Sequence, residues 1–370
     1  MKLPRTTNHS LVGIVLLMAT SNASADSNFD EIVVTSKRQG VAAADHIGNI
    51  ARLSEDAIRE SQHAHVNELM VKVPGVWIAR GSGQESLPAI RSPVLTGPGS
   101  CGAFLILENG IPTRPSGFCN VNQLFELPTE LAAGVEVIRG PGNALYGSNA
   151  IAGTVNVITK DPILNTWEIG SNLALIDGEQ PDRVLSFNTS VVADDLKSGI
   201  TLFGNYRNRD PYDANKDGFT EIVKLRNLTL GAKAFLRPTE RSRISLNLNA
   251  IDEYRRGGDR LDLAPQFTDI TEELDHDTFI GGADYEVTSA DGRKRTQVYT
   301  SASYTRRKSY YGGLGGGRTP QDSTLANNAF GNTKDLAWVS GVQYTHSLQN
   351  RDVLTLGLEY NLAATEDEIP

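Results

Sequence analysis

From residue 164 onward, apolar and polar residues alternate with a period of two, in nine segments of roughly 10 residues each. Successive side chains of a β-strand point to opposite faces, so this alternation gives each strand one apolar and one polar face. In the clearest segment, 227–237, leucine and alanine at even positions alternate with Asn227, Thr229 and Lys233. The pattern predicts tilted antiparallel strands that cross a membrane, although a soluble β-sandwich can show it too.

The connections between these segments favour a barrel. After the first two hairpins, connections alternate in length between long and short. We predict long ones at 208–222, 252–277 and 309–334, and short ones at 239–240, 290–292 and 350–351. Short turns at one end and long loops at the other are typical of outer-membrane barrels.

Nine strands make an incomplete barrel. Single-chain bacterial barrels have even strand numbers, and plugged transporters have about 22 strands. An open edge in lipid would leave backbone groups without hydrogen-bond partners. We therefore expect the sequence to be truncated and, as given, unable to close a barrel.

The composition excludes other classes of protein. No internal apolar run approaches the roughly 18 residues that a transmembrane helix needs, and 39% of the residues are hydrophobic. The net charge of −9 argues against a nucleic-acid partner. No sequence motif of a nucleophile, a catalytic base or a phosphate-binding loop is present, so we expect no enzyme.

The N-terminus has the features of a secretion signal. Lys2 and Arg5 precede the apolar run 11–19, which is too short to span a bilayer. The segment 23–25, Ala-Ser-Ala, offers a cleavage site between small residues. We predict that residues 1–25 are a signal peptide and that cleavage follows Ala25.

The two cysteines, Cys101 and Cys119, would then reach a compartment that permits disulfides. A disulfide between them, which would stabilise the fold by about 3 kcal/mol, is favoured. Two free thiols or a metal site are the alternatives.

The segment before the alternating strands mixes short helices and strands, as in a small α+β domain. Ser54 can cap a helix that ends before Pro74, and a second helix is expected at 124–131. Strands are expected at 76–78, 89–91, 104–107, 135–138 and 154–159, with a turn at Asn109-Gly110.

The last two of these strands belong to the stretch 134–160, GVEVIRGPGNALYGSNAIAGTVNVITK. This stretch resembles the end of the plug domain of TonB-dependent outer-membrane receptors, which carry the pattern VEVIRGP-x-x-x-LYGS-x-AIGG-x-[IV]-N-[IV]-I-T. Ala152 departs from the pattern at one position. The motif positions are Arg139, Gly140, Pro141, Tyr146, Gly147, Ser148, Gly153 and Asn156.

A short β-prone run after the predicted cleavage site is similar to the TonB box of the same family, although it could also be an ordinary edge strand. Its residues are Asp30, Glu31, Ile32, Val33, Val34, Thr35 and Ser36. The resemblance implies that TonB, the energy-coupling partner, binds this segment. An extended segment can be captured by adding a strand to a partner's sheet.

The resemblance implies an α+β plug domain followed by an antiparallel transmembrane β-barrel, with about nine of roughly 22 strands present. The expected divisions are a signal peptide (1–25), the TonB box and linker (26–40), the plug domain (41–163) and a partial barrel (164–370). It also implies a receptor in the outer membrane of a Gram-negative bacterium, in contact with lipid, that imports a scarce ligand.

A ferric siderophore is the first expectation for that ligand. Cobalamin is the second, and haem or another metal complex remains open. A passive porin would have neither plug nor box, and a secreted structural β-protein would lack the alternation of loop lengths.

The segment 213–221 resembles the first half of a calcium-binding loop, with oxygen-bearing side chains at alternate positions and Gly218 for a sharp turn. Lys224 stands where a complete EF-hand has its last glutamate. A structural Ca²⁺ and a solvated acidic loop both remain open, and no cofactor is required. The candidate ligands are Asp213, Asn215, Asp217 and Glu221.

Cationic and aromatic residues near the predicted outer loops are candidates for ligand contacts. They suit an anionic iron chelate through charge and cation–π contacts. As an alternative, each is a solvated or membrane-interface residue. They are Arg80, Tyr212, Tyr254, Arg255, Arg256, Tyr310 and Tyr311.

Overall fold

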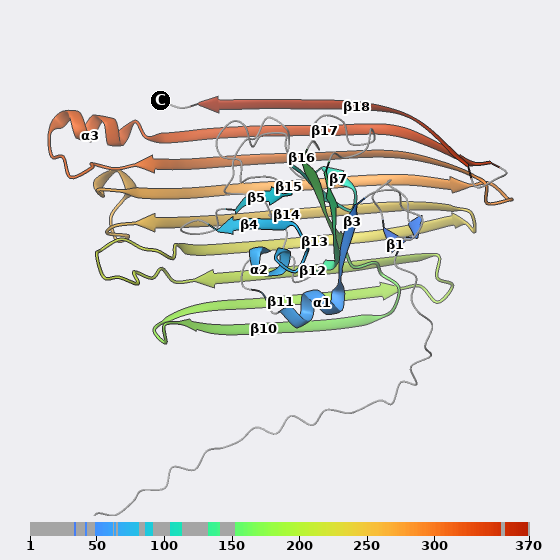
Figure 1. Ribbon diagram of the computed structural model, residues 1–370, viewed down its shortest axis with the longest axis horizontal. Coiled ribbons are helices and arrows are strands. Elements are labelled where there is room, and N and C mark those ends of the chain that lie inside the picture. Colours follow the sequence, from blue (N-terminus) through green and yellow to red (C-terminus); the bar gives the residue numbers. More distant parts are fainter. Residues whose placement is uncertain are drawn as a thin grey trace, which may run out of the picture.

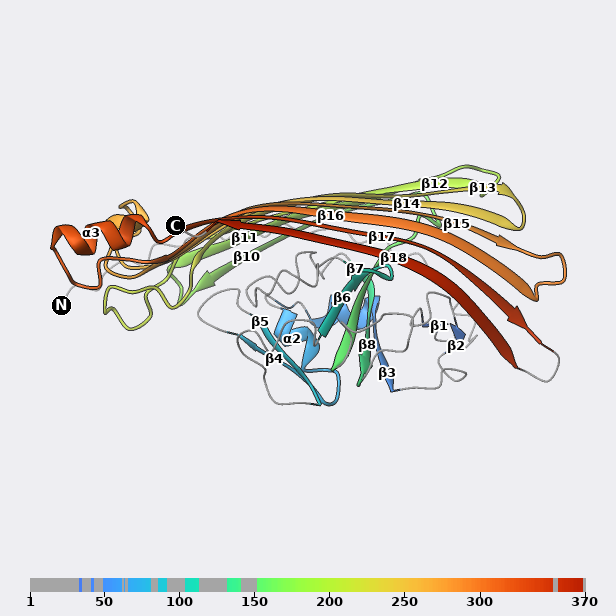
Figure 2. The same ribbon diagram turned by 90° about the horizontal axis from the view of Figure 1, so that it is seen from above.

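The structure is a computed structural model, and it describes residues 33–34, 41–42, 49–61, 63, 66–80, 86–91, 104–112, 132–140, 152–348 and 352–368. These residues form a small α+β domain and a nine-stranded antiparallel sheet. Figure 1 shows the long strands of the sheet side by side in sequence order. The sheet is curved, and the small domain lies on its concave side (Figure 2).

Each strand of the large sheet pairs with its neighbours in sequence, which confirms the predicted series of nine antiparallel strands. The strands are β10 (Thr166–Ile176), β11 (Gln180–Val192), β12 (Ser198–Arg209), β13 (Lys224–Thr239), β14 (Ser242–Gly258), β15 (Thr271–Thr288), β16 (Lys294–Gly312), β17 (Phe330–Ser347) and β18 (Val353–Glu368).

The strands are longer than the sequence predicted, from 11 residues in β10 to 19 residues in β16. The predicted bounds of two long connections, 252–277 and 309–334, are therefore wrong, and these connections shrink to 259–270 and 313–329. Antiparallel pairing satisfies the backbone whichever side chains it carries, so the strands continue beyond their apolar segments.

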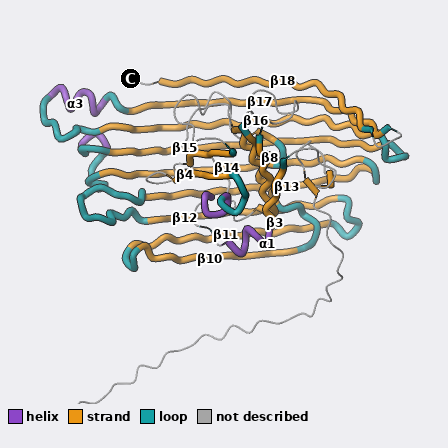
Figure 3. Tube along the Cα trace, viewed as in Figure 1, coloured by secondary structure: helices purple, strands orange, loops and turns teal. Residues whose placement is uncertain are grey.

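The alternation of connection lengths is retained. The long connections 210–223, 259–270 and 313–329 gather at one end of the sheet, on the left in Figure 1. They contain the 3₁₀ turn η6 (Pro265–Phe267) and the helix α3 (Pro320–Asn327), which Figure 3 shows in purple at that end. The short connections 193–197, 240–241 and 289–293 lie at the opposite end.

The two faces of the sheet differ in chemistry. Lys233 reaches the small domain, and strand alternation places Thr229 and Thr278 on the same inner face, where both are fully buried. Leu248 and Phe279 lie on the outer face and are 49% and 56% exposed. The inner face is thus polar and the outer face apolar, as in membrane barrels.

The small domain is built on a five-stranded sheet of order β3-β8-β9-β6-β7, in which only β6 and β9 run parallel. A separate hairpin, β4–β5, and two short helices complete its described part. The elements are β3 (Ile50–Ser54), α1 (Glu55–Ser61), α2 (Val66–Met70), β4 (Val76–Arg80), β5 (Ser86–Ile90), β6 (Phe104–Glu108), β7 (Ile111–Pro112), β8 (Ala132–Arg139) and β9 (Gly153–Thr159).

The core of this domain lies between the helices and one face of the sheet. Leu69 and Met70 of α2 and Val135 and Val137 of β8 are completely buried in one hydrophobic cluster. Apolar burial on this scale is the main stabilising contribution in such a domain. The alternating valines of β8 therefore fix which face of the strand meets the helices.

The single helix expected between Ser54 and Pro74 is instead two helices. Ser54 caps the first, since its Oγ accepts a hydrogen bond from the Ala57 N–H at 3.3 Å. At the end of α1 the Ser61 hydroxyl donates to the Ile58 carbonyl at 2.7 Å, which satisfies a group left free where the helix ends. The helix predicted at 124–131 falls on residues that the structure does not describe.

The motif residue Asn156 ties β9 to the neighbouring turn. Its Oδ1 accepts a hydrogen bond from the Gly110 N–H at 2.9 Å. The turn is the predicted Asn109-Gly110 pair, and both residues have positive φ, 49° and 80°. Asn109 Nδ2 also donates to Thr159 Oγ1 at 2.8 Å. The end of the motif therefore holds the β6–β7 turn against β9.

Two further motif residues are described. Arg139 Nη1 donates to the carbonyl of Pro74 at 2.8 Å, which ties the end of β8 to the segment between α2 and β4. At Gly153, a Cβ atom would lie 2.7 Å from Ile90 Cδ1 and 2.9 Å from the Ile138 carbonyl oxygen. Glycine is required at position 153 because a backbone oxygen and a core side chain approach it closely.

The segment Val33–Val34 forms a short strand, β1, that pairs antiparallel with β2 (Val41–Ala42). Across the part of the chain that the structure describes, no helix is long and apolar enough to cross a membrane.

We predict that Gly153→Ala lowers the stability of the small domain by about 1–3 kcal/mol, because the added methyl group overpacks Ile90 and the β8 backbone. Hydrogen exchange of the β8 and β9 amides measures this loss directly. Gly281→Ala is the control, since the nearest atom to its Cβ is the flexible Leu248 Cδ2 at 3.3 Å. Unchanged protection of β8 and β9 in Gly153→Ala would contradict the prediction.

Candidate functional site

Four arginines occupy the inner face of the sheet near the long connections. Strand pairing places Arg209, Leu225 and Arg255 in one row across β12, β13 and β14. The adjacent row on the same face runs from Arg207 through Asn227, Glu253 and His276 to Arg307. We call these two rows the arginine wall. Side chains far apart in the sequence thus meet because the strands pair in order.

Two carboxylates accompany these arginines. Arg207 Nη2 lies 2.6 Å from Asp182 Oδ2, and Arg255 Nε lies 2.9 Å from Glu253 Oε1. Arg209 Nε donates to the carbonyl of Val223 at 3.2 Å. Glu272 and Asp367 also act on Arg307 through their charge, so the four arginines are accompanied by carboxylates on several strands.

Arg255 of the wall has a buried donor without an acceptor. Its side chain is 4% exposed, and within the described residues its Nη2 makes no hydrogen bond. A buried cationic donor that lacks an acceptor is costly, and an added acceptor at that position is correspondingly favourable. The geometry therefore suits an anionic, oxygen-rich ligand.

Two of the predicted ligand-contact residues, Arg255 and Tyr311, lie on this inner face. Arg307 Nη2 donates to Tyr311 Oη at 3.3 Å, and Tyr311 is 46% exposed. The sequence prediction did not single out Arg209 or Arg307. Their placement at the loop-proximal ends of strands was the available signal, with Arg209 in the row of Arg255 and Arg307 in the adjacent row.

Three other predicted contact residues, Tyr254, Arg256 and Tyr310, lie on the opposite, outer face. Tyr254 Oη and Arg256 Nη1 both donate to Glu273 Oε2, at 2.9 and 3.0 Å. Tyr310 packs edge-on against Phe330, with ring centroids 4.7 Å apart. The structure thus does not bring these three residues to the arginine wall.

Two predicted contact residues lie elsewhere. Tyr212 Oη donates to Asp177, which links the connection 210–223 to the β10–β11 turn. Arg80 ends β4, and its side chain is outside the described part of the structure.

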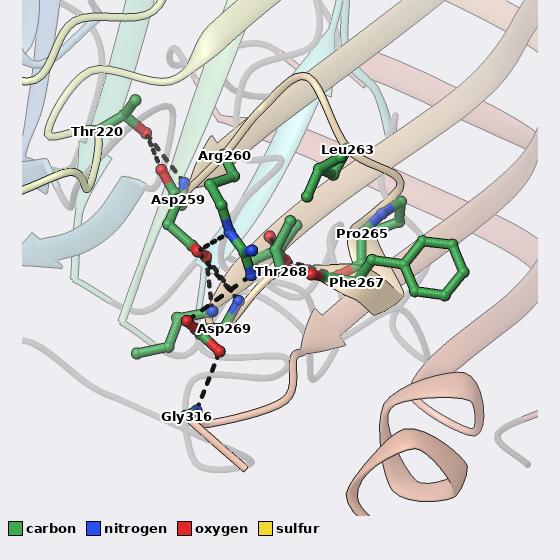
Figure 4. A network of polar contacts seen from close by, with 12 residues as sticks. Thr220, Asp259, Arg260, Leu263, Pro265, Phe267, Thr268, Asp269 and Gly316 are labelled. Carbon is green, nitrogen blue, oxygen red and sulfur yellow. Dashed lines mark hydrogen bonds and ion pairs between the residues drawn. The ribbon is translucent and has the colours of Figure 1, made fainter. Parts of the chain in front are cut away.

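The long connections 259–270 and 313–329 are joined by an ionic network (Figure 4). Arg318 Nη1 lies 2.7 Å from Asp269 Oδ1, and the Gly316 N–H donates to the same oxygen at 3.1 Å. Asp259 Oδ1 accepts hydrogen bonds from the N–H groups of Asp269 and Ile270, at 2.9 and 2.8 Å. We call this network the loop clamp.

The loop clamp shifts the titration of its carboxylates. The hydrogen bond from Arg318 holds the pKa of Asp269 below its usual value. Burial acts to raise the pKa of Asp259, but the two backbone hydrogen bonds and Arg260 outweigh burial and lower it. Both carboxylates therefore stabilise the clamp in their charged form.

A pocket of about 560 Å³ opens beside the clamp. Apolar side chains and several glycines line most of it, and Asp269 and Glu272 contribute carboxylates. The lining of the pocket includes Phe219, Val223, Gly257, Ile270 and Tyr311. Tyr311 also touches Arg307, so the pocket adjoins the arginine wall.

The predicted calcium ligands lie in the connection 210–223. Oxygen atoms of Asp213, Asp217 and Glu221 lie within 4.8 Å of one another. Asp213 already accepts hydrogen bonds from the backbone N–H groups of Lys216 and Gly218, at 2.7 and 2.8 Å. These bonds account for the Asp213 carboxylate without an ion, and calcium binding by this loop stays a prediction.

Several predicted sites fall on residues that the structure does not describe. They are the signal peptide (1–25), the box residues Asp30, Glu31, Ile32, Thr35 and Ser36, the motif residues Pro141, Tyr146, Gly147 and Ser148, and the cysteines Cys101 and Cys119.

We predict that Arg318→Gln makes the long loops open at higher pH than in the wild type. A carboxylate with a lowered pKa stabilises the fold above its usual value of 3.8, and that contribution is lost as the pH falls through the folded value. Without Arg318, Asp269 is protonated at a higher pH. Pepsin cleavage within 259–270 and 313–319, followed while the pH is lowered, measures the opening.

Arg241→Gln is the matched control, because Arg241 lies in the short turn 240–241 at the other end of the sheet. In Arg241→Gln the long loops should open at the same pH as in the wild type. Cleavage of Arg318→Gln at that same pH would show that the ion pair does not hold the clamp.

The small domain corresponds to a known family. Residues 42–154 match the family model described as "TonB-dependent Receptor Plug Domain". The match includes α1, α2, β6, β8 and the start of the motif stretch. The plug domain predicted from the motif is therefore confirmed, and we use that name for the small domain below.

Solved structures match the fold of the two parts together. The siderophore receptor PirA from Pseudomonas aeruginosa is 18% identical, with a TM-score of 0.61, over 87% of this chain and 49% of that one. A mutant of the ferric enterobactin receptor PfeA from the same organism is 17% identical, with a TM-score of 0.65, over 89% of this chain and 50% of that one. The ferric-catecholate import receptor Fiu from E. coli K12 is 15% identical, with a TM-score of 0.61, over 89% of this chain and 51% of that one.

The chain spans about half the length of these structures, and at this identity they establish the fold. That fold is a plug domain against an antiparallel barrel sheet, as the sequence predicted. The matched proteins are receptors rather than enzymes. Residues 42–154 are therefore a TonB-dependent receptor plug domain, and the chain as a whole has the fold of the matched receptors.

Proposed function

We propose that the protein imports an anionic ferric siderophore across the outer membrane of a Gram-negative bacterium, with energy supplied through TonB. The observation that carries this proposal is the arginine wall, which brings four arginines together at the loop end of the inner face and includes a buried donor of Arg255 without an acceptor in the described residues. The matched solved structures include siderophore receptors, and one is a PfeA mutant in complex with enterobactin.

Charge complementarity is the physical basis of the ligand assignment. Iron chelates of catecholate groups carry negative charge on oxygen atoms, which accept hydrogen bonds from guanidinium groups. Arginine also stacks on aromatic rings. Arg255, with a buried donor that lacks an acceptor within the described residues, is the side chain that gains most from such a ligand.

Cobalamin is the second candidate. The feature that favours cobalamin is the loop 213–221, which would place a calcium site among the long connections. Haem or another metal complex remains a further alternative. A ligand without strong negative charge would gain little from the arginine wall, so the charge dependence of binding separates these candidates.

Replacing Arg255 with glutamine is expected to weaken binding of ferric enterobactin by roughly tenfold or more, since a hydrogen bond to a charged group contributes about 1.5–3 kcal/mol. Binding to the purified complete receptor measures the change, with cyanocobalamin as the second probe. Arg226→Gln is the control, because Arg226 lies on the outer face and is half exposed.

The outcomes separate the alternatives. Loss of ferric enterobactin binding in Arg255→Gln alone supports the siderophore assignment. Equal binding by both variants would refute the role of the arginine wall. Tight binding of cyanocobalamin by the wild type and by both variants would favour the cobalamin alternative.

The coupling to TonB predicts a separate effect at the N-terminal strand β1. Val34→Pro removes a backbone N–H that a partner strand needs, so it should abolish uptake and leave ligand binding unchanged. Val34→Ala keeps that N–H and is the control. Iron uptake by cells, measured beside binding to the same cells, tests both variants. Normal uptake by Val34→Pro would exclude this segment as the TonB box.

A further inference from the structure

A buried carboxylate of the plug domain meets the barrel sheet. Glu108 ends β6, and its side chain is 3% exposed. Both of its carboxylate oxygens accept from the same donor, Nδ2 of Asn249 on β14, each at 2.7 Å. The two carboxylate oxygens thus share one nitrogen donor in a bifurcated arrangement, in which each hydrogen bond is weaker than a single well-aligned one.

The other half of the Asn249 amide lacks a partner. Asn249 is 6% exposed, and in the described residues its Oδ1 accepts no hydrogen bond. This oxygen lies 2.4 Å from where a Cβ on residue 231 would stand, beside the ring of Phe203. Position 231 is glycine, so that residue has no side chain to bond the oxygen. The Glu108 carboxyl, on the other side of the same amide, is close enough to supply a donor when it is protonated.

We propose that Glu108 is a proton-binding site between plug and barrel: the protonated carboxyl donates to Asn249 Oδ1 while Asn249 Nδ2 donates to the other carboxyl oxygen. The pair then forms two complementary hydrogen bonds across the interface. A rotation of the amide places each of its atoms opposite one carboxyl oxygen. The proton comes from solvent and returns to it, and no other group changes.

The charged surroundings of Glu108 agree with a shared proton. Among described residues, the cation that acts on it is Lys233 of β13. Lys233 is already engaged, with its Nζ 2.8 Å from Asp161 Oδ1 and 3.0 Å from the Thr159 carbonyl. Asp161 in turn lies 3.4 Å from Arg243 Nη2 of β14. The close contacts of Lys233 thus go to Asp161 and Thr159, and Lys233 acts on Glu108 through charge alone.

Burial raises the pKa of Glu108 to about 7, against the lowering effects of Asn249 and Lys233. A carboxyl with a raised pKa stabilises the folded arrangement below its usual value of 4.5, and this contribution is lost as the pH rises through about 7. The plug should therefore be held to β14 more firmly at acidic pH than at alkaline pH.

Infrared spectroscopy of the purified protein tests the proposal, because a protonated carboxyl absorbs apart from a carboxylate. The wild type should show a protonated carboxyl that titrates near pH 7, and Glu108→Gln should lose it. Glu60→Gln, at an exposed position on α1, is the control and should keep it. A band that survives in Glu108→Gln, or a wild type that titrates at the usual 4.5, would overturn the proposal.

Lys233→Met provides a second test that does not remove the carboxyl. Loss of the attraction from Lys233 should move the titration to higher pH. Hydrogen exchange of β6 and β9 amides, corrected for the intrinsic rate, should increase above pH 7 in the wild type and stay level in Glu108→Gln. An unchanged titration in Lys233→Met would refute the assignment to Glu108. Neither measurement uses a ligand, so they stand apart from the siderophore proposal.

Discussion

Backbone hydrogen bonding between strands that follow one another in sequence is the constraint on which the structure depends. Every strand from β10 to β18 pairs antiparallel with its sequence neighbours, so residues as far apart in sequence as Lys294 and His346 become direct partners. This pairing aligns Arg209, Arg255 and Arg307 on one face, and Leu230, Leu248 and Phe279 on the other. The site and the apolar face have the same origin.

The polar inner face also determines how the plug domain is held. A plug that packed through apolar surface alone would bury the polar inner residues without partners, which is costly. Among the described residues, polar contacts join the two parts, through Glu108, Asn249 and Lys233 and between Lys160 and Glu168. Such contacts can be rearranged without exposing a hydrophobic core, since the plug keeps its own core between α2 and β8.

The sequence predicted the elements well because their patterns are local. Strand alternation, the Asn109-Gly110 turn and the connection lengths each depend on neighbouring residues. The face of a residue near a strand end is harder to predict, because a shift by one position reverses it. This is why Tyr254, Arg256 and Tyr310 were expected at the ligand site and lie on the outer face. The sequence did not indicate that Glu108 contacts the barrel, because it is the last residue of an apolar strand. Its partner Asn249 is 141 residues away in the sequence, and only the fold brings the two together.

Three of the contacts from the barrel to the plug region share one short piece of chain. Lys233 lies on β13, Arg243 and Asn249 lie on β14, and the two strands are joined by the turn 240–241. A mechanical load on the plug would thus pass in part into a single hairpin, and in part through Lys160 and Glu168 into β10. The neighbouring strands could keep their shape while this hairpin yields, so that the barrel need not deform as a whole when the plug is pulled.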